Sequence, residues 1–435
     1  MKTQFRLALG ALSAGLALSP FAHAKAATCE SLAGLKTADG VVTSAGRMAA
    51  GAKLSLTGPL ATIPIAPVAA DLCRVKAKLS PVKGSDINVE VWLPATWNGK
   101  LVGVGGGGFS GGLDTAVIML NPLVGRGYVA AATDVGHPSS DGAKWAYKHP
   151  VQLVDYAHRG NHVTALFAKA LIKAFYGRPI QHAYFNGCSN GGRDALMEAW
   201  RYPNDYDGIV AGAPAAPWVR DMTDFAWNTR AVSAPGAALT VAKLKLVSDA
   251  VMARCDAIDG VKDGILENPH SCRFEPTDLK CNGADGPNCL TDAQIKALQA
   301  VYQGPRGRGG RKISNGFSVG GESVQWADWI TNEKSSQRGF AEEFYRWMVY
   351  ADESWTLDRF DLDRDFDTAM ARMGPILNSD NPNLQPFMRG GGKLIVYHGW
   401  ADAALSPDNT IDFFEALNRT TPQAAGQARL FMVPG

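Results

Sequence analysis

The segment 187–192, which reads Gly-Cys-Ser-Asn-Gly-Gly, carries the clearest chemical signal in this sequence. The spacing Gly-x-Ser-x-Gly is typical of a nucleophile elbow, where glycines let a strand turn sharply into a helix and expose the serine hydroxyl. The start of a helix also presents backbone N–H groups to a developing oxyanion. The segment therefore predicts Ser189 as a nucleophile and the Asn190 N–H as an oxyanion donor, with a purely structural turn as the alternative.

A run of glycines at 105–108 is the second candidate for this chemistry. It follows a short apolar stretch, and hydrolases with a nucleophile elbow place another oxyanion donor after such an earlier strand. Glycine also lets the backbone approach a substrate closely. We therefore predict Gly105 as the second donor. A phosphate-cradling loop is the alternative, but neither Gly-Lys-Ser/Thr nor a GxGxxG followed by a helix occurs here.

The acid and the base of a serine triad are the next requirement, in the chain order Ser, acid, His. Asp402 fits the acid because it lies just past an apolar stretch, in the sequence Gly-Trp-Ala-Asp at 399–402. A capping aspartate is the alternative. No histidine follows Asp402, and His398 flanks the same strand, so we expect His398 to pack beneath the site. The sequence as given lacks the base.

The elements around these residues alternate between strand and helix. Such alternation favours an α/β protein with a mostly parallel sheet covered by helices on both faces, the α/β-hydrolase fold. The predicted strands span 87–93, 100–104, 128–133, 182–186, 209–212, 393–397 and 429–433, and the clearest helices span 163–175, 193–201 and 407–417.

The alternation is interrupted between residues 215 and 374, where four of the seven cysteines and many aromatic residues lie. We predict that this segment is inserted into one α/β domain, whose two parts span 25–214 and 375–435. Two tandem domains are the alternative.

The N-terminus has the features of a signal peptide. Lys2 and Arg6 precede an apolar run, and small residues around Ala24 offer a cleavage site, so we assign 1–24 to export into the periplasm or the medium. An anchor that stays uncleaved is the alternative. Export makes disulfides plausible. Sequence separation favours three pairs and leaves Cys188 over; the pairs are Cys29 with Cys73, Cys255 with Cys272, and Cys281 with Cys289.

The overall composition excludes several classes of protein. The 435 residues carry a net charge of +2 and are 46% hydrophobic, which excludes a disordered chain and gives no field for nucleic acid or an anionic membrane. We therefore expect no nucleic-acid partner and no stable membrane association. An RNA contact at the basic cluster 306–312 is the alternative to a solvated loop.

Four segments together resemble the tannase/feruloyl esterase family, which includes the mono(hydroxyethyl) terephthalate hydrolases. They are 187–192, 206–214, 255–260 and 397–402, and the resemblance runs from about Cys29 to Gly435. It implies a serine esterase without an organic cofactor. It also implies that Cys188 is disulfide-bonded to a cysteine directly after the catalytic histidine. Because 429–435 resembles the strand before that His-Cys pair, we expect both residues beyond 435.

The resemblance also implies that the insertion is a lid with a structural Ca²⁺ site. Carboxylate oxygens on a tight turn suit Ca²⁺. The implied ligands are the carboxylates of Asp256, Asp259 and Asp263 and the carbonyls of Val261 and Ile265; without the resemblance, a solvated acidic turn is favoured. The lid's aromatic residues at 326, 329, 344 and 347 would contact substrate or, as we favour, form the lid's own core.

These features predict an exported serine carboxylesterase that hydrolyses small-molecule esters of aromatic acids, such as feruloyl or galloyl esters, through an acyl-enzyme. A catalytically silent protein that binds aromatic esters is one alternative, and a peptidase with the same fold is another. Reading the next codons of the gene would test the silent alternative, and hydrolysis of matched ester and amide substrates would separate a peptidase from the esterase.

Overall fold

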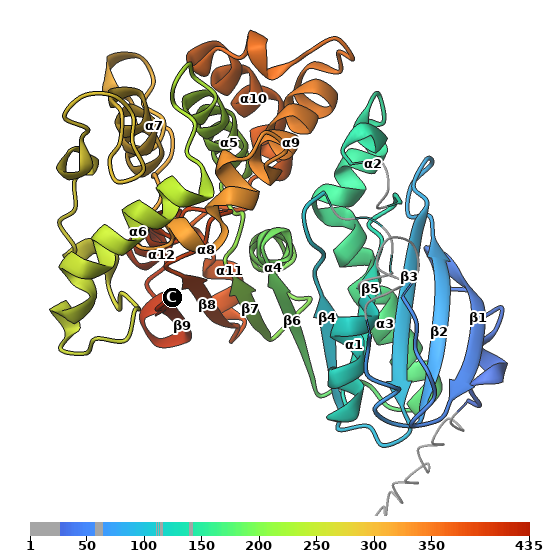
Figure 1. Ribbon diagram of the computed structural model, residues 1–435. Helices are drawn as coiled ribbons and strands as arrows, with labels where there is room; N and C mark the ends of the chain where they lie inside the picture. Colours follow the sequence, from blue (N-terminus) through green and yellow to red (C-terminus); the bar gives the residue numbers. More distant parts are fainter. Residues whose placement is uncertain (1–26, 57–63, 110, 112, 114–115, 139–141) are drawn as a thin grey trace, which may run out of the picture.

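The computed structural model describes residues 27–56, 64–109, 111, 113, 116–138 and 142–435, so the predicted signal peptide at 1–24 lies outside the described residues. A nine-stranded mixed sheet forms the centre, in the order β1-β2-β3-β5-β4-β6-β7-β8-β9 (Figure 1). The strands are β1 (Gly40–Met48), β2 (Leu72–Leu79), β3 (Ile87–Pro94), β4 (Lys100–Val104), β5 (Val129–Thr133), β6 (His182–Cys188), β7 (Gly208–Gly212), β8 (Lys393–Gly399) and β9 (Ala428–Val433).

The type of strand pairing changes once across the sheet, at β5. β1, β2, β3 and β5 pair antiparallel, whereas β5, β4, β6, β7, β8 and β9 pair parallel. The prediction of a mostly parallel sheet is confirmed. The carboxyl ends of the parallel strands meet at one edge, which is where α/β sheets carry their sites.

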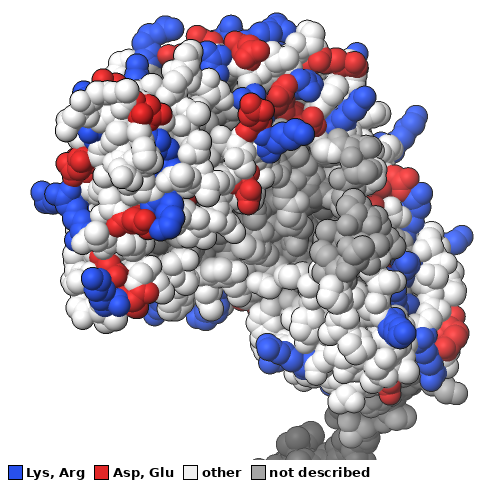
Figure 2. Space-filling model, viewed as in Figure 1, with Lys and Arg blue, Asp and Glu red and all other residues white. Residues whose placement is uncertain are grey.

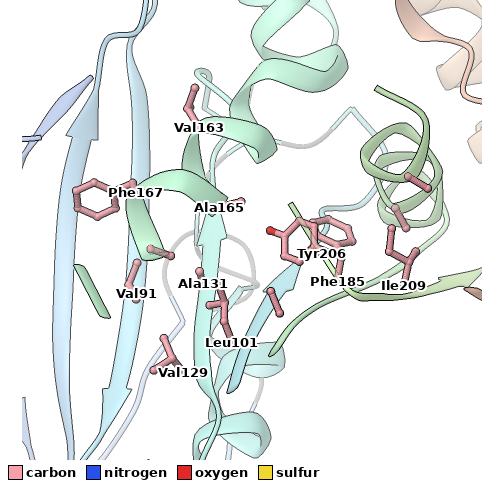
Figure 3. Packing of buried hydrophobic residues seen from close by; sticks show 14 of the residues in the cluster. Val91, Leu101, Val129, Ala131, Val163, Ala165, Phe167, Phe185, Tyr206 and Ile209 are labelled. Atoms are coloured by element: carbon pink, nitrogen blue, oxygen red, sulfur yellow. The ribbon is translucent and has the colours of Figure 1, made fainter. Parts of the chain in front are cut away.

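Helices cover both faces of the sheet because successive strand residues point to opposite sides. On one face, Val129 and Ala131 of β5 join a core with α3 (Gly160–Tyr176) and α4 (Asn190–Arg201), part of which Figure 3 shows. On the other face, Ala130 and Ala132 pack with α1 (Ala116–Gly125). The remaining short helices of this part are α2 (Pro150–Val154), α11 (Gln385–Arg389) and α13 (Ala424–Gln427), and α12 (Pro407–Thr420) packs on β8.

The insertion between β7 and β8 contains helices and no strand, and its helices gather to one side of the molecule, away from β1 to β3 (Figure 1). Its α-helices are α5 (Trp218–Val232), α6 (Val241–Cys255), α7 (Asp292–Gln303), α8 (Glu322–Trp326), α9 (Ser336–Glu343) and α10 (Leu362–Leu377). The boundary predicted after residue 374 falls inside α10, which continues to Leu377 because its hydrogen-bonded turns run on past Gly374.

The aromatic residues of the insertion mainly build its own interior, as the sequence favoured. Trp326, Phe344 and Trp347 are buried, whereas Trp329 is partly exposed. Two apolar clusters divide the insertion, one around α5, α9 and α10 and the other around α6 and α7.

Both charge signs are interspersed over the face shown in Figure 2, so the described residues there form no broad region of one sign. In the predicted basic loop, Arg311 pairs with Asp363 and Asp367, and Lys312 pairs with Asp412. Within the described residues, every helix is too short or too polar to cross a bilayer.

Candidate active site

Ser189 occupies a strained backbone position between β6 and α4. Its φ of 61° and ψ of −123° lie outside the regions that side-chain-bearing residues normally adopt. The strain is held because the Ser189 N–H donates to the Gly212 carbonyl at 3.0 Å while its own carbonyl accepts from Arg193 and Ala215. Such a turn lifts the side chain off the end of the strand, as a nucleophile elbow requires.

The glycines of the elbow are required by close backbone packing. A Cβ on Gly187 would lie 2.2 Å from the Gly191 carbonyl oxygen, and one on Gly192 would lie 2.5 Å from the Gly212 oxygen. A Cβ on Gly191 would lie 2.8 Å from the Gly106 oxygen. The elbow therefore sits directly against β7 and against the glycine segment 105–108.

The two predicted oxyanion donors are placed differently. Asn190 begins α4, so its N–H belongs to the first turn, where N–H groups point out of the helix end. The Gly105 N–H instead donates to the Asn186 carbonyl at 3.0 Å, which extends the pairing of β4 with β6. A donor used in the sheet is not available to an oxyanion, so this arrangement does not support Gly105 in that role. Gly105 serves close packing, since a Cβ there would lie 2.6 Å from the Gly191 Cα.

Asp402 lies at the same edge of the sheet as Ser189. In the ladder, Cys188 pairs with Gly212, and Gly212 pairs with Tyr397, so the residues that follow β6 and β8 leave the sheet at the same edge, with β7 between them. Asp402 Oδ1 accepts from the N–H groups of Ala404 (2.7 Å) and Leu405 (3.0 Å), which fixes the carboxylate in its loop. The side chain stays partly open to solvent, with 21% of its surface exposed.

The histidine nearest this carboxylate is His398, which is fully buried, as predicted. Its Nε2 lies 3.2 Å from Asp402 Oδ2 and 3.2 Å from the Leu405 carbonyl, and its Nδ1 lies 2.8 Å from Thr410 Oγ1. The sequence did not predict the contact with Asp402. None of the seven histidines in the described residues forms a hydrogen bond with Ser189; they are His137, His149, His158, His162, His182, His270 and His398.

Cys188 is the free cysteine, as expected, and it ends β6 directly before Ser189. Burial raises the pKa of its thiol, against the hydrogen bond with the Tyr397 side chain, and the negative charge of Asp402 raises it further. Burial likewise raises the pKa of Tyr397. The thiol is therefore kept protonated, and its environment does not favour a nucleophilic thiolate.

Aromatic rings from the insertion meet the end of the glycine segment. Phe109 follows this segment and packs against Trp218 of α5 and Phe340 of α9, with ring centroids 6.0 and 5.0 Å apart. Trp329 stacks on Phe340 with an interplanar angle of 2°. These rings give the neighbourhood of the elbow an apolar, aromatic wall.

The predicted calcium ligands lie on one short turn of the insertion. Asp256 Oδ1 accepts from the Gly264 N–H at 2.8 Å, Asp259 Oδ1 from Val261, and Asp263 Oδ1 from Ile265. The donor types suit Ca²⁺. However, no three His, Cys, Asp or Glu residues in the described part of the chain are gathered as a metal ion would need. In this arrangement the carboxylates stabilise the turn, and calcium remains a prediction.

The three disulfides are those predicted, Cys29–Cys73, Cys255–Cys272 and Cys281–Cys289. The first ties the N-terminal end to β2, and the other two lie within the insertion. Sequence analysis missed the fully buried pair Arg193 and Asp194, which follows the elbow directly. Two adjacent charged residues so close to the start of α4 were the signal that could have revealed this pair.

Known proteins resemble this chain over most of its length. The sequence model described as tannase and feruloyl esterase matches residues 73–435. An uncharacterized esterase of Xanthomonas campestris pv. campestris is 35% identical, over 99% of this chain and 79% of its own length. A probable feruloyl esterase B-2 of Aspergillus terreus is 31% identical, over 81% of this chain and 66% of its own length.

Solved structures agree with the sequence relatives. Feruloyl esterase B from Aspergillus oryzae superposes with a TM-score of 0.85 at 26% identity, covering 94% of this chain and 82% of the other. Tannin acyl hydrolase from Aspergillus niger has a TM-score of 0.73 at 20% identity, covering 92% and 79% of the two chains, which shows a shared fold. The predicted α/β-hydrolase architecture is therefore confirmed.

Proposed function

This chain belongs to the tannase and feruloyl esterase family of carboxylic ester hydrolases, and from that premise we propose that it is an exported serine esterase acting on esters of aromatic acids. The observation that carries the proposal is the strained elbow, which sets Ser189 at the same edge of the sheet as the Asp402 loop. The partly exposed rings of Phe109, Trp329 and Phe340 suit a substrate with an aromatic ring.

In this mechanism Ser189 Oγ attacks the ester carbonyl and forms a tetrahedral intermediate. The Asn190 N–H and the positive end of α4 stabilise the oxyanion. Asp402 orients a histidine that removes the serine proton and then donates it to the leaving alcohol. Water attacks the resulting acyl-enzyme and releases the aromatic acid, so no organic cofactor is required.

The base itself is proposed to lie beyond residue 435. His398 cannot take this role because both ring nitrogens already have partners and the ring is fully buried. A histidine after β9 would reach the same sheet edge, because β9 runs parallel to β8 and is its neighbour. Cys188 would then form a disulfide with a cysteine next to that histidine.

We predict that the gene continues past codon 435 with His and then Cys within about five codons. The reason is that Cys188, which is free of any disulfide here, directly precedes Ser189 in a site that supplies a nucleophile and an acid. Sequencing the gene and its transcript beyond codon 435 checks the prediction. A stop codon at 436, or a continuation without His-Cys, would contradict it and favour a silent, ester-binding protein.

The function itself is tested by hydrolysis of methyl ferulate, a gallate ester and the matching amides by the full-length gene product. We expect at least one of the two esters to be cleaved and the amides to remain. Cleavage of the amides at comparable rates would instead support a peptidase. The three disulfides support export, since such bonds persist mainly in oxidising compartments.

The inserted helices are proposed to act as a lid with a structural calcium site on the turn that contains Asp256, Asp259 and Asp263. Calcium that binds the folded chain alone would stabilise it by mass action. We expect a chelator to lower the melting temperature, and Asp259→Ala to remove this response without changing the chemistry at Ser189. Asp249→Ala is a matched control, because that carboxylate is exposed on α6 and pairs only with Lys245. A melting curve unchanged by chelator, with no calcium in elemental analysis, would contradict the calcium site and support a solvated acidic turn.

A further inference from the structure

A fully buried ion pair lies directly behind the elbow. Arg193 and Asp194 are adjacent in α4, their side chains are 0% and 2% exposed, and Arg193 Nη2 lies 2.7 Å from Asp194 Oδ1. A buried pair of charges is often no more stabilising than apolar residues of the same volume. Neither residue takes part in the proposed chemistry, so the pair calls for another explanation.

All three nitrogens of the Arg193 guanidinium donate hydrogen bonds. Its Nε donates to Asn190 Oδ1 at 2.6 Å, which fixes the side chain of the residue that follows Ser189. The remaining N–H groups face carbonyl or carboxylate oxygens from three other places in the chain. These acceptors are the carbonyls of Ala157 (2.8 Å), Tyr156 (3.3 Å) and Leu377 (3.5 Å), together with Asp194.

Asp194 and Tyr156 hold the glycine segment 105–108 from behind. The Gly106 N–H and the Asn161 side chain both hydrogen-bond to the Asp194 carboxylate and lower its pKa, although burial dominates and raises the pKa to about 6. The Tyr156 hydroxyl lies 3.1 Å from the Gly108 carbonyl and 3.1 Å from Asn190 Oδ1, so one proton serves two acceptors. The glycine segment and the start of α4 are thus bonded to the same buried network.

The network also reaches both ends of the inserted helices. Arg193 lies over the ring of Trp218, at the start of α5, with its guanidinium carbon 5.4 Å from the centroid. The Leu377 carbonyl ends α10. The Arg193 side chain therefore contacts α4, residues 156–157, and both ends of the insertion, at Trp218 and Leu377.

We propose that Arg193 and Asp194 are positioning residues that hold the glycine segment and Asn190 in one arrangement around Ser189. The proposal rests on the esterase function proposed above, because it concerns the backbone that would surround the oxyanion. Groups that stabilise a transition state must be fixed before the reaction, since misplacement by about 1 Å can cost on the order of 100-fold in rate.

The test replaces Asp194 with asparagine in the full-length gene product. We expect kcat for methyl ferulate to fall at least about 10-fold with KM within about twofold, because ground-state binding does not use this backbone. The affinity for an aryl boronic acid, which forms a tetrahedral adduct with the serine, should fall by a similar factor. Amide hydrogen exchange in a peptide covering 105–108 should become at least about 10-fold faster, because the segment loses its anchor.

Asp365→Asn is the matched control. Asp365 also follows an arginine, is fully buried and accepts from Arg364 Nε at 2.7 Å, but it lies in α10 of the insertion. We expect this variant to lower the melting temperature without a selective loss of kcat or faster exchange at 105–108. If Asp194→Asn does not fold, Asn161→Ala removes one donor to Asp194 and should give a smaller acceleration of exchange in the same peptide.

The outcomes separate the two proposals. Unchanged exchange at 105–108 in the folded variant would overturn the positioning role whatever the activity. Faster exchange with unchanged kcat and boronic-acid affinity would also overturn it. Faster exchange in a protein whose wild type hydrolyses no ester would support the anchoring of the segment and contradict the esterase function instead.

Discussion

Replacement of Ser189 by alanine is expected to lower kcat for methyl ferulate or a gallate ester at least about 10³-fold, while the fold and the KM change little. The substitution removes the oxygen that would attack the ester. The elbow itself should persist, because the backbone bonds of Ser189 to Gly212, Arg193 and Ala215 do not involve the side chain. Steady-state kinetics with the full-length gene product, together with melting curves, measure both effects.

Ser31→Ala provides the matched control for this variant. Ser31 is exposed near the N-terminal disulfide, and its hydroxyl bonds only locally to Thr28. Its loss should leave kcat within about twofold of wild type. Near-normal turnover in Ser189→Ala would exclude Ser189 as the nucleophile, however clear the geometry of the elbow.

Gly187→Ala is expected to have the largest effect on stability. The new Cβ would lie 2.2 Å from the Gly191 carbonyl oxygen and 2.4 Å from its carbonyl carbon, both backbone atoms that cannot rotate away. Relief requires the elbow to move, and we expect the free energy of unfolding to fall by about 3 kcal/mol or more. Urea unfolding of the purified variant, or its failure to accumulate as folded protein, measures this loss.

Gly339→Ala is the corresponding control, because nothing lies within 4 Å of a Cβ at that position in α9. Alanine replaces glycine in a helix with a gain of roughly 0.5–1 kcal/mol. A Gly187→Ala protein as stable as wild type would mean that the elbow is looser than the close contact of its backbones indicates.

The sequence predicted the central strands within one or two residues, because each is a short apolar run that ends in glycine or a turn. It missed β1 and β2. β1 is an edge strand with few buried residues, so it carries little periodic signal. β2 does alternate, with Cys73, Val75, Ala77 and Leu79 buried, and this pattern could have revealed it.

The elbow was predictable because its requirements are local: three glycines, a serine and a following helix lie within one short segment. The use of the Gly105 N–H was not, because its acceptor Asn186 belongs to a strand that is distant in sequence. The same holds for the buried network of Arg193, whose acceptors come from three separate segments: α4, residues 156–157 and the end of α10. Residue types indicate which chemistry is possible, whereas tertiary pairing decides which donors remain for it.

The position of the insertion has a consequence for how substrate range can diverge. The chain leaves the sheet after β7 and returns at β8, and these strands are direct neighbours, with Gly208 opposite Lys393 and Gly212 opposite Tyr397. The helices that supply Trp218, Trp329 and Phe340 therefore form one uninterrupted stretch of the gene, bounded by two fixed points about one strand spacing apart. Recombination could exchange the whole insertion while the strand register of the sheet is kept. Substrate specificity can then change without a change in the sheet that carries Ser189 and Asp402.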